Sequence, residues 1–95
     1  MIVFISGKMR GLAGLGRARF NTAEQWLIGR GHTVLNPAKL PVGMPEEKYM
    51  PICLAMLEAA DAIYMLDNWT SSEGANVEHA YAKLQGKQIL YEDQV

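Results

Sequence analysis

One glutamate stands out as a group that could do chemistry. Glu78 lies four residues after Gly74 in the stretch WTSSEGANVEHAYA, near the start of a segment with helical spacing. Glutamate is a common helix former, so this carboxylate can be an ordinary solvated charge. A carboxylate can also attack an electron-poor carbon, form a covalent ester and then yield it to water or to another acceptor. The spacing alone favours the first interpretation, and both stay open at this point.

Two short segments could hold an anion close to that glutamate. SGKMRG offers backbone N–H groups beside Lys8 and Arg10, and SSEG offers hydroxyls and N–H groups at a helix start. A phosphate or a carboxylate would fit between them. Neither segment is a phosphate fingerprint by itself, because the chain lacks GxxxxGK[ST] and its GLAGLG stretch is not in the GxGxxG register.

The other polar candidates point to structure rather than to a metal centre. His32 lies in a glycine turn, and His79 points about 100° around the helix from Glu78. Neither histidine has a partner at metal-ligand spacing, and the one cysteine, Cys53, is too few for a structural zinc site. Asp61 is interpreted as a turn-capping residue. We expect no metal site and no cofactor.

The elements that must position these residues alternate between strand and helix. Short β-branched and aromatic runs predict strands at residues 2–7, 32–35, 61–66 and 87–92. Helical spacing predicts helices through residues 20–29, from 45 or 46 to 60, and from a cap at Ser71 or Ser72 to about residue 85. The second helix tolerates Pro51 only near its first turns.

This alternation predicts an α/β fold of the flavodoxin-like or Rossmann-like type. The expected architecture is a three-layer sandwich around a parallel sheet of four strands in the order 2-1-3-4, with right-handed crossovers. A chain of 95 residues, about half of them apolar, suits one domain spanning residues 1–95.

The fold class narrows the search for a binding site to one edge of the sheet. In open parallel sheets, ligands collect beyond the carboxyl ends of the strands, near the point where the strand order reverses. In this chain the rule selects loop residues after the first three strands, together with the serine pair that precedes the helix of Glu78. The residues selected are Ser6, Gly7, Lys8, Met9, Asn36, Asp67 and Asn68.

Composition and charge exclude several classes of partner. The formal net charge is −1 with both signs spread along the chain, so we expect no binding to nucleic-acid polymers. The apolar N-terminal run is too short for a membrane span and lacks the features of a signal peptide. The single cysteine fits a reducing compartment. We therefore expect a cytoplasmic protein without a membrane anchor.

Several stretches, in order along the chain, carry a resemblance to a known family. They are VFISGKMRG, FNTAEQWLIGRGHTVLNPA, ADAIYML and WTSSEGANVEHAYA, the last of which reads W-x-x-S-x-G-A-x-x-E. On these motifs the chain resembles the nucleoside 2-deoxyribosyltransferase superfamily, and in particular its short branch of the DUF4406 type. Family members of known activity break or exchange the N-glycosidic bond of 2-deoxynucleosides or of their 5′-monophosphates.

The resemblance implies roles for individual residues. Glu78 corresponds to the glutamate that attacks the anomeric carbon of the sugar. In the relatives that cleave monophosphates, the phosphate lies against residues that correspond to Ser72 and Gly74, with Lys8 in the facing loop. The resemblance thus implies a small-molecule nucleoside or nucleotide as the ligand. Longer relatives continue beyond the equivalent of YEDQV and lend tail residues to a neighbouring subunit's site, a departure that leaves those contacts open for this chain. A homodimer or a larger homo-oligomer is expected, because a sheet this small gains by covering its edges.

Two positions depart from the family pattern and keep an alternative open. Phe4 stands where the family usually has a tyrosine that hydrogen-bonds the nucleophile, and Cys53 stands where it usually has an aspartate. Asp67 is the second catalytic candidate, because it could compensate for one of these groups. The alternative function is a non-catalytic protein that binds or sequesters nucleotides on the same fold. A small module that only forms homo-oligomers is a further, weaker possibility.

Overall fold

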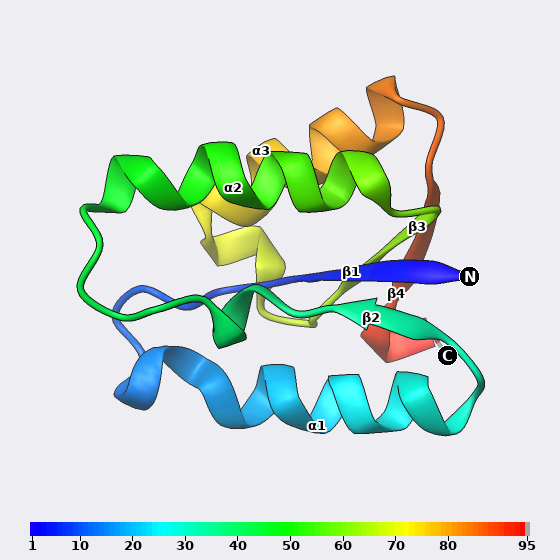
Figure 1. The fold of residues 1–95 in the computed structure, drawn as a ribbon, viewed down its shortest axis with the longest axis horizontal. Helices are drawn as coiled ribbons and strands as arrows, with labels where there is room; N and C mark the ends of the chain where they lie inside the picture. Colours follow the sequence, from blue (N-terminus) through cyan, green and yellow to red (C-terminus); the bar gives the residue numbers. More distant parts are fainter. Residues whose placement is uncertain (95) are drawn as a thin grey trace.

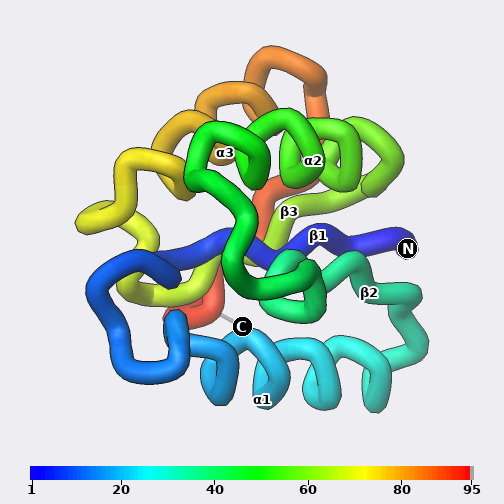
Figure 2. The backbone as a smooth tube through the Cα atoms, turned by 60° about the vertical axis from the view of Figure 1, so that its left-hand side comes forward, coloured from blue at the N-terminus to red at the C-terminus, as the bar shows by residue number. Residues whose placement is uncertain are grey.

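The chain forms a three-layer α/β sandwich, and the computed structural model describes residues 1–94 (Figure 1). Helices α2 and α3 cover one face of the sheet and α1 covers the other (Figures 1 and 2). The strands are β1 (Ile2–Ser6), β2 (Thr33–Leu35), β3 (Ala62–Met65) and β4 (Gln88–Tyr91). The helices are α1 (Arg17–Gly29), α2 (Glu46–Ala59) and α3 (Glu73–Leu84).

The sheet is parallel and its strand order is β2-β1-β3-β4, which confirms the predicted topology. Val3 of β1 lies opposite Val34 on one side and Ala62 on the other, and Ile63 of β3 lies opposite Ile89. The N-terminal end of β1 is held by Asp61, whose side chain accepts a hydrogen bond of 2.8 Å from the N–H of Ile2. Asp61 therefore has a structural role, but it joins two segments 59 residues apart rather than capping its own turn.

The helix boundaries follow from local chemistry. Ser72, rather than Ser71, is the N-cap of α3, because its side chain accepts a hydrogen bond from the N–H of Ala75 at 3.1 Å. Pro51 lies inside α2, in its second turn, where its missing N–H removes only one hydrogen bond of the helix. Among the described residues, no helix is both long and apolar enough to cross a bilayer.

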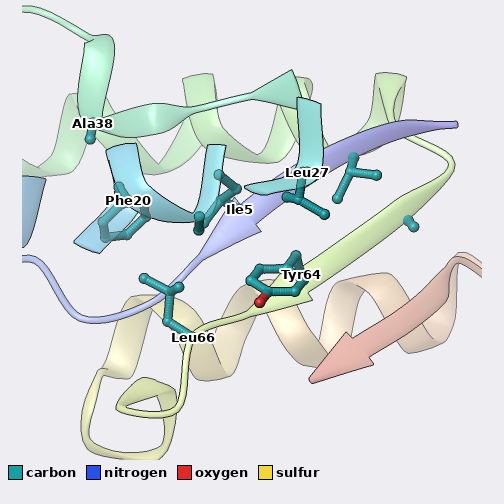
Figure 3. Packing of buried hydrophobic residues seen from close by; sticks show 9 residues of the cluster. Ile5, Phe20, Leu27, Ala38, Tyr64 and Leu66 are labelled. Carbon is teal, nitrogen blue, oxygen red and sulfur yellow. The ribbon is translucent and has the colours of Figure 1, made fainter. Parts of the chain in front are cut away.

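The core is divided by the sheet into two apolar clusters. Alternate residues of a strand point to opposite faces, so Val3 and Ile5 pack toward α1 while Phe4 packs toward α2 and α3. Figure 3 shows the α1 side, where Ile5, Phe20, Leu27, Tyr64 and Leu66 meet. On the other side Phe4 packs in one cluster with Cys53, Leu57, Ile63 and Met65.

The loops that follow β1, β2 and β3 gather at one end of the molecule (Figure 2). Gly7 is required there by close packing, because a Cβ atom on it would lie 2.7 Å from a methyl carbon of Leu66. The backbone of Leu66 also donates to the carbonyl of Ser6 at 2.8 Å. The first and third loops therefore leave the sheet in tight contact.

Candidate active site

A cavity of ≈ 690 Å³ opens beyond the carboxyl ends of the strands. Its walls come from the β1–α1 loop, from the first half of α2, and from the start of α3. A volume of this size is in the usual range for small-molecule sites. The predicted site residues that line it are Ser6, Gly7, Lys8, Met9, Arg10, Ser72, Gly74 and Glu78.

Glu78 lies at the base of this cavity and is only 7% exposed. It shares the inward face of α3 with Ala75 and Ala82, at helical spacing. The hydroxyl of Ser6 donates to its Oε1 at 2.5 Å, and the thiol of Cys53 lies within hydrogen-bonding reach. The tertiary structure thus excludes a solvated surface position for this carboxylate.

The electrostatics of Glu78 are those of a buried acid without a cationic partner. Burial raises its pKa to about 7, and hydrogen bonds from Ser6 and Cys53 offset only part of that rise. No ion pair within residues 1–94 involves Glu78. Burial, with the neighbouring Glu78 as a second cause, raises the pKa of the Cys53 thiol to about 12. Cys53 is therefore a neutral thiol and a weak donor at physiological pH.

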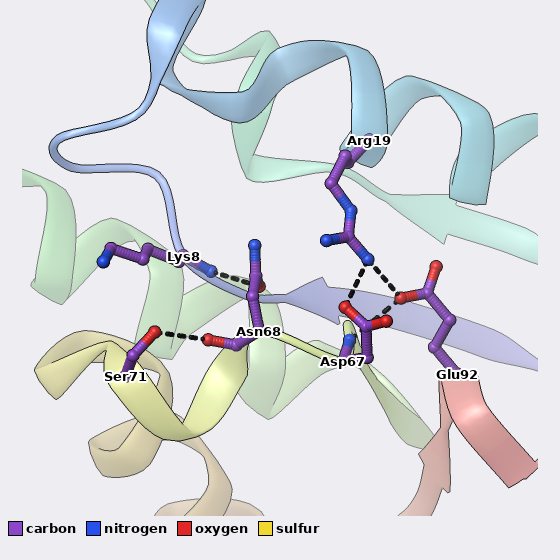
Figure 4. A network of polar contacts seen from close by, with 6 residues as sticks. All are labelled: Lys8, Arg19, Asp67, Asn68, Ser71 and Glu92. Atoms are coloured by element: carbon purple, nitrogen blue, oxygen red, sulfur yellow. Dashed lines mark hydrogen bonds and ion pairs between the residues drawn. The ribbon is translucent and has the colours of Figure 1, made fainter.

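The start of α3 forms one side of the cavity and is suited to an anion. Helix geometry leaves the N–H groups of the first turn without partners in the helix, and the helix dipole adds positive potential there. The Ser72 cap engages the N–H of Ala75, which leaves the N–H groups of Glu73 and Gly74 as the available donors. Lys8 lies across the same cavity, and its backbone N–H is held by Asn68 at 3.0 Å (Figure 4).

Arg10 has a second role that the sequence did not indicate. Its guanidinium forms an ion pair with the carboxylate of Glu46 at the start of α2, and both residues line the cavity. Both side chains are largely exposed, so the pair is a weak contact between the β1–α1 loop and α2. An anionic ligand would have to compete with Glu46 for this arginine.

Apolar walls complete the cavity, and sequence reasoning missed most of them. Met44 and Met50 line it from the segment leading into α2 and from α2 itself, while Met9 and Phe20 line it from the β1–α1 side. Tyr49 also lines it and donates its hydroxyl to the carbonyl of Pro41 at 2.5 Å. No local motif marks these positions, because they belong to segments far apart in sequence.

Asp67 does not line the cavity, which separates it from the other predicted catalytic residue. Its carboxylate pairs with Arg19 of α1 at 2.5 Å, and Glu92 reaches the same arginine at 2.7 Å (Figure 4). The N–H of Asp67 also donates to Glu92 at 2.9 Å. This cluster ties the end of β3 to α1 and to the segment after β4, so the carboxylate of Asp67 is engaged away from the cavity.

Asn36 also lies outside the cavity lining, although it follows β2 as expected. Its amide nitrogen donates to Asn21 at 3.1 Å and to Glu24 at 3.0 Å, and its oxygen accepts from the N–H of Ala38 at 2.9 Å. Both N–H donors and the oxygen of this 6% exposed side chain are thereby engaged in holding the turn after β2 against α1. Asn36 is a structural residue in this geometry.

His79 has partners that the sequence spacing did not reveal. Its ring stacks on Trp69 with centroids 4.3 Å apart, and its Nε2 lies 2.8 Å from the hydroxyl of Tyr91. None of the three lines the cavity, so Trp69 closes the core rather than offering a face to a ligand there. Across residues 1–94, no group of three or more His, Cys, Asp or Glu side chains is arranged to hold a metal ion.

Comparison with known proteins agrees with this architecture. A solved structure of a "2-desoxiribosyltransferase from Leishmania mexicana" superposes with a TM-score of 0.74 at 21% identity. The match covers 95% of this chain but 62% of the other, so the chain spans less than two thirds of that enzyme's length. This likeness shows a nucleoside 2-deoxyribosyltransferase-like fold. No curated protein sequence matches the chain.

A family assignment rests on the sequence itself. Residues 1–91 match the family described as "Domain of unknown function (DUF4406)". The matched segment contains every helix and strand of the sandwich, as well as all the residues that line the cavity. The chain therefore belongs to the DUF4406 family.

Proposed function

We propose that this chain cleaves or exchanges the N-glycosidic bond of 2-deoxynucleosides or of their 5′-monophosphates, with Glu78 as the nucleophile. The observation that carries the proposal is the buried carboxylate at the base of the cavity, held by neutral donors and unpaired with any described cation. The fold shared with a 2-deoxyribosyltransferase supports the same reaction class. Small-molecule nucleosides or nucleotides are the corresponding ligands.

The chemistry follows from the state of the carboxylate. An ionised Glu78 oxygen bonds to the anomeric carbon, the C–N bond breaks, and its electron pair leaves with the base, which takes a proton from water. Water or a second base then attacks the same carbon and releases Glu78. Two inversions give net retention of configuration. Because burial raises its pKa to about 7, Glu78 is more basic once ionised than an exposed glutamate.

The lining of the cavity supports an orientation for the substrate. A sugar ring at Glu78 would place a 5′-phosphate toward the N–H groups of Glu73 and Gly74, with Lys8 opposite. The nucleobase would then lie against apolar lining residues of the β1–α1 side, Met9 and Phe20. Methionine adapts its shape to a flat ring, so this wall suits more than one base.

A non-catalytic nucleotide-binding protein is the second candidate function. Phe4 is fully buried in an apolar cluster and brings no hydroxyl to Glu78. Cys53 is a thiol where related enzymes usually have an aspartate, and its pKa of about 12 leaves it without charge. Removing preorganised polar groups around a reacting centre costs ~10²-fold to 10³-fold in rate for each group. These two residues favour binding without efficient turnover.

Base release separates the two candidates. The protein is incubated with the four deoxynucleosides and their 5′-monophosphates, and free base is measured by chromatography beside Glu78→Ala. Glu58→Gln is the matched control, because Glu58 is an exposed α2 glutamate that does not line the cavity. Release by the wild type and the control, but not by Glu78→Ala, supports catalysis. Tight binding without release supports the alternative, and the absence of both contradicts both.

Assembly into a homodimer or a larger homo-oligomer is part of the same proposal. Val77 and Leu84 of α3 are 49% and 81% exposed, although both are apolar. Covering such residues against a second copy would remove them from water. Sedimentation velocity tests this directly: a monomer at micromolar concentration would contradict it.

A further inference from the structure

Ser6 has a contact that its expected role in substrate binding did not predict. Its Oγ donates to Oε1 of Glu78 at 2.5 Å, and the two residues are 1% and 7% exposed. A hydroxyl that donates to a buried carboxylate forms a charge-assisted hydrogen bond, which is shorter and stronger than a neutral one. The hydroxyl is thus engaged with Glu78 and not presented to a ligand.

The backbone of Ser6 is held by β3 and the residue that follows it. Ser6 is the last residue of β1 and lies opposite Met65 in the register with β3. Its carbonyl accepts a hydrogen bond of 2.8 Å from Leu66. A short side chain on a fixed strand has few rotamers, so the hydroxyl has a defined position. This is the kind of rigid support that an oriented nucleophile requires.

Ser6 lies on the same face of β1 as Phe4, because side chains two residues apart in a strand point the same way. Phe4 is the position at which related enzymes usually carry the tyrosine that bonds the nucleophile, and phenylalanine has no hydroxyl. The hydrogen bond is nevertheless present, two residues further along the strand. A hydroxyl therefore reaches Glu78 from the strand that carries Phe4, but from its last residue.

We propose that Ser6 is the positioning residue for Glu78, supplying from the end of β1 the hydroxyl that Phe4 cannot supply. This inference rests on the proposed function of Glu78 as the nucleophile. The hydroxyl engages Oε1 and so fixes the orientation of the carboxylate. Cys53 approaches from α2, but a thiol is a weak donor and cannot replace a hydroxyl.

Kinetics of Ser6→Ala test the role in the reaction. We expect kcat for base release to fall ~10²-fold, with KM changed by less than about twofold, because a positioning contact acts on the transition state rather than on binding. Ser6→Thr keeps a hydroxyl on the same carbon and should recover most of the lost rate. Thr22→Ala, which deletes an exposed hydroxyl on α1, should behave as the wild type. An unchanged kcat, or a rise in KM alone, overturns the proposal.

A second measurement separates this inference from the proposed function. Carbon-13 NMR of labelled glutamate follows the titration of the Glu78 carboxyl without any substrate, and Glu78→Gln identifies its signal. The other titratable groups that line the cavity, which could contribute to its pKa, are Lys8, Arg10, Glu46, Tyr49, Cys53 and Glu73. They are the same in wild type and Ser6→Ala, so a difference between the two titrations reports the serine.

The expected result is a higher titration midpoint in Ser6→Ala, because the hydrogen bond from Ser6 lowers the pKa of Glu78. Circular dichroism confirms that the variant folds. An unchanged midpoint overturns the positioning role, even if the wild type releases base. A raised midpoint in a protein that releases no base supports the contact and contradicts only the proposed function.

Discussion

Two glutamates with little exposed surface lie on opposite faces of the sheet, and their pKa values shift in opposite directions. Glu24 of α1 and Glu78 of α3 are each 7% exposed. Glu24 pairs with Nζ of Lys39 at 2.9 Å and accepts from Asn36 at 3.0 Å. The lysine contact is the main reason that the pKa of Glu24 is lowered. Glu78 has only neutral donors, and burial raises its pKa to about 7.

Burial is the main cause of the raised pKa of Glu78, whereas the contact with a lysine is the main cause of the lowered pKa of Glu24, so burial and the partner together decide what such a carboxylate does. A cation compensates the loss of hydration, so Glu24 stays ionised and stabilises the packing of α1 on the turn after β2. Without a cation, Glu78 keeps a basic oxygen at the cost of stability. Such a cost is typical of functional sites. Substitutions at either glutamate's site test this contrast.

The largest effect is expected from Glu78→Gln. Base release should fall at least ~10³-fold, because an amide is not a nucleophile. The same variant should be more stable than the wild type at pH 8, by up to roughly 3 kcal/mol, because it no longer ionises a buried carboxyl. Urea unfolding at two pH values measures the second effect.

The sign of that pH dependence follows from the raised pKa. The ordinary pKa of a glutamate is 4.5 and the pKa of Glu78 in the folded protein is about 7. Between these pH values the native state therefore holds one more proton than the unfolded state. The contribution of Glu78 to stability is complete below pH 4.5 and declines as the pH rises to about 7. The extra stability of Glu78→Gln over the wild type should therefore vanish near pH 4. An equal gain at pH 4 and pH 8 would show that ionisation is not its cause.

Asn36→Ala should have the next largest effect, on stability. It removes three hydrogen bonds inside the fold and leaves buried groups of Glu24 and Ala38 without their partner. We expect a loss of about 2 to 3 kcal/mol in the free energy of unfolding, measured by urea at pH 7. A loss below about 0.5 kcal/mol would be typical of a surface position and would contradict the structural role.

Lys39→Met removes the cation from Glu24 and makes its environment more like that of Glu78. Lys39 is 62% exposed, so solvent screens the pair and the expected loss is about 1 kcal/mol at pH 7. Because the pKa of Glu24 is lowered, the stabilisation is present above its ordinary pKa and is lost as the pH falls through the folded value. The difference in the free energy of unfolding between variant and wild type should therefore shrink in acid. A constant difference down to pH 2 would contradict an ion-pair origin.

The smallest effect is expected from Asp67→Asn. Its partner Arg19 is exposed, so the pair should contribute about 0.5 kcal/mol and less at high salt. Because Asp67 does not line the cavity, base release should stay within about twofold of wild type. A loss of rate comparable to that of Glu78→Gln would show that Asp67 takes part in catalysis.

The fold could be predicted from the sequence because its signals are local. Strand and helix alternate. Gly7 and Asn36-Pro37 mark the ends of strands, Ser72 marks the start of a helix, and the parallel order follows from short right-handed crossovers. The structure added details: Ser72 rather than Ser71 is the cap of α3, and Trp26 of α1 is 37% exposed. Arg30 covers its ring, 4.3 Å from the centroid.

The candidate site could be predicted only in part, because a strand-end rule does not say which way a side chain points. The rule selected Ser6, Asp67 and Asn36 alike. Ser6 points to the face of α2 and α3 and meets Glu78, whereas Asp67 turns toward Arg19 and Asn36 closes its own turn. A shift of one residue changes the face of the sheet, and nothing in the loop sequences marks that change.

The sequence by itself determined the order of the elements and the edge of the sheet at which a site would form, and its resemblance to a known family marked Glu78 as the candidate nucleophile. The tertiary structure alone decided the environment of that residue: a hydroxyl at 2.5 Å from β1, a thiol from α2, and no cation among the described residues. Periodicity and capping act between neighbours in the chain, but the pKa of a buried acid depends on groups brought together by folding. Glu24 pairs with a lysine 15 residues away in sequence, and Glu78 accepts a hydrogen bond from a serine 72 residues away in sequence.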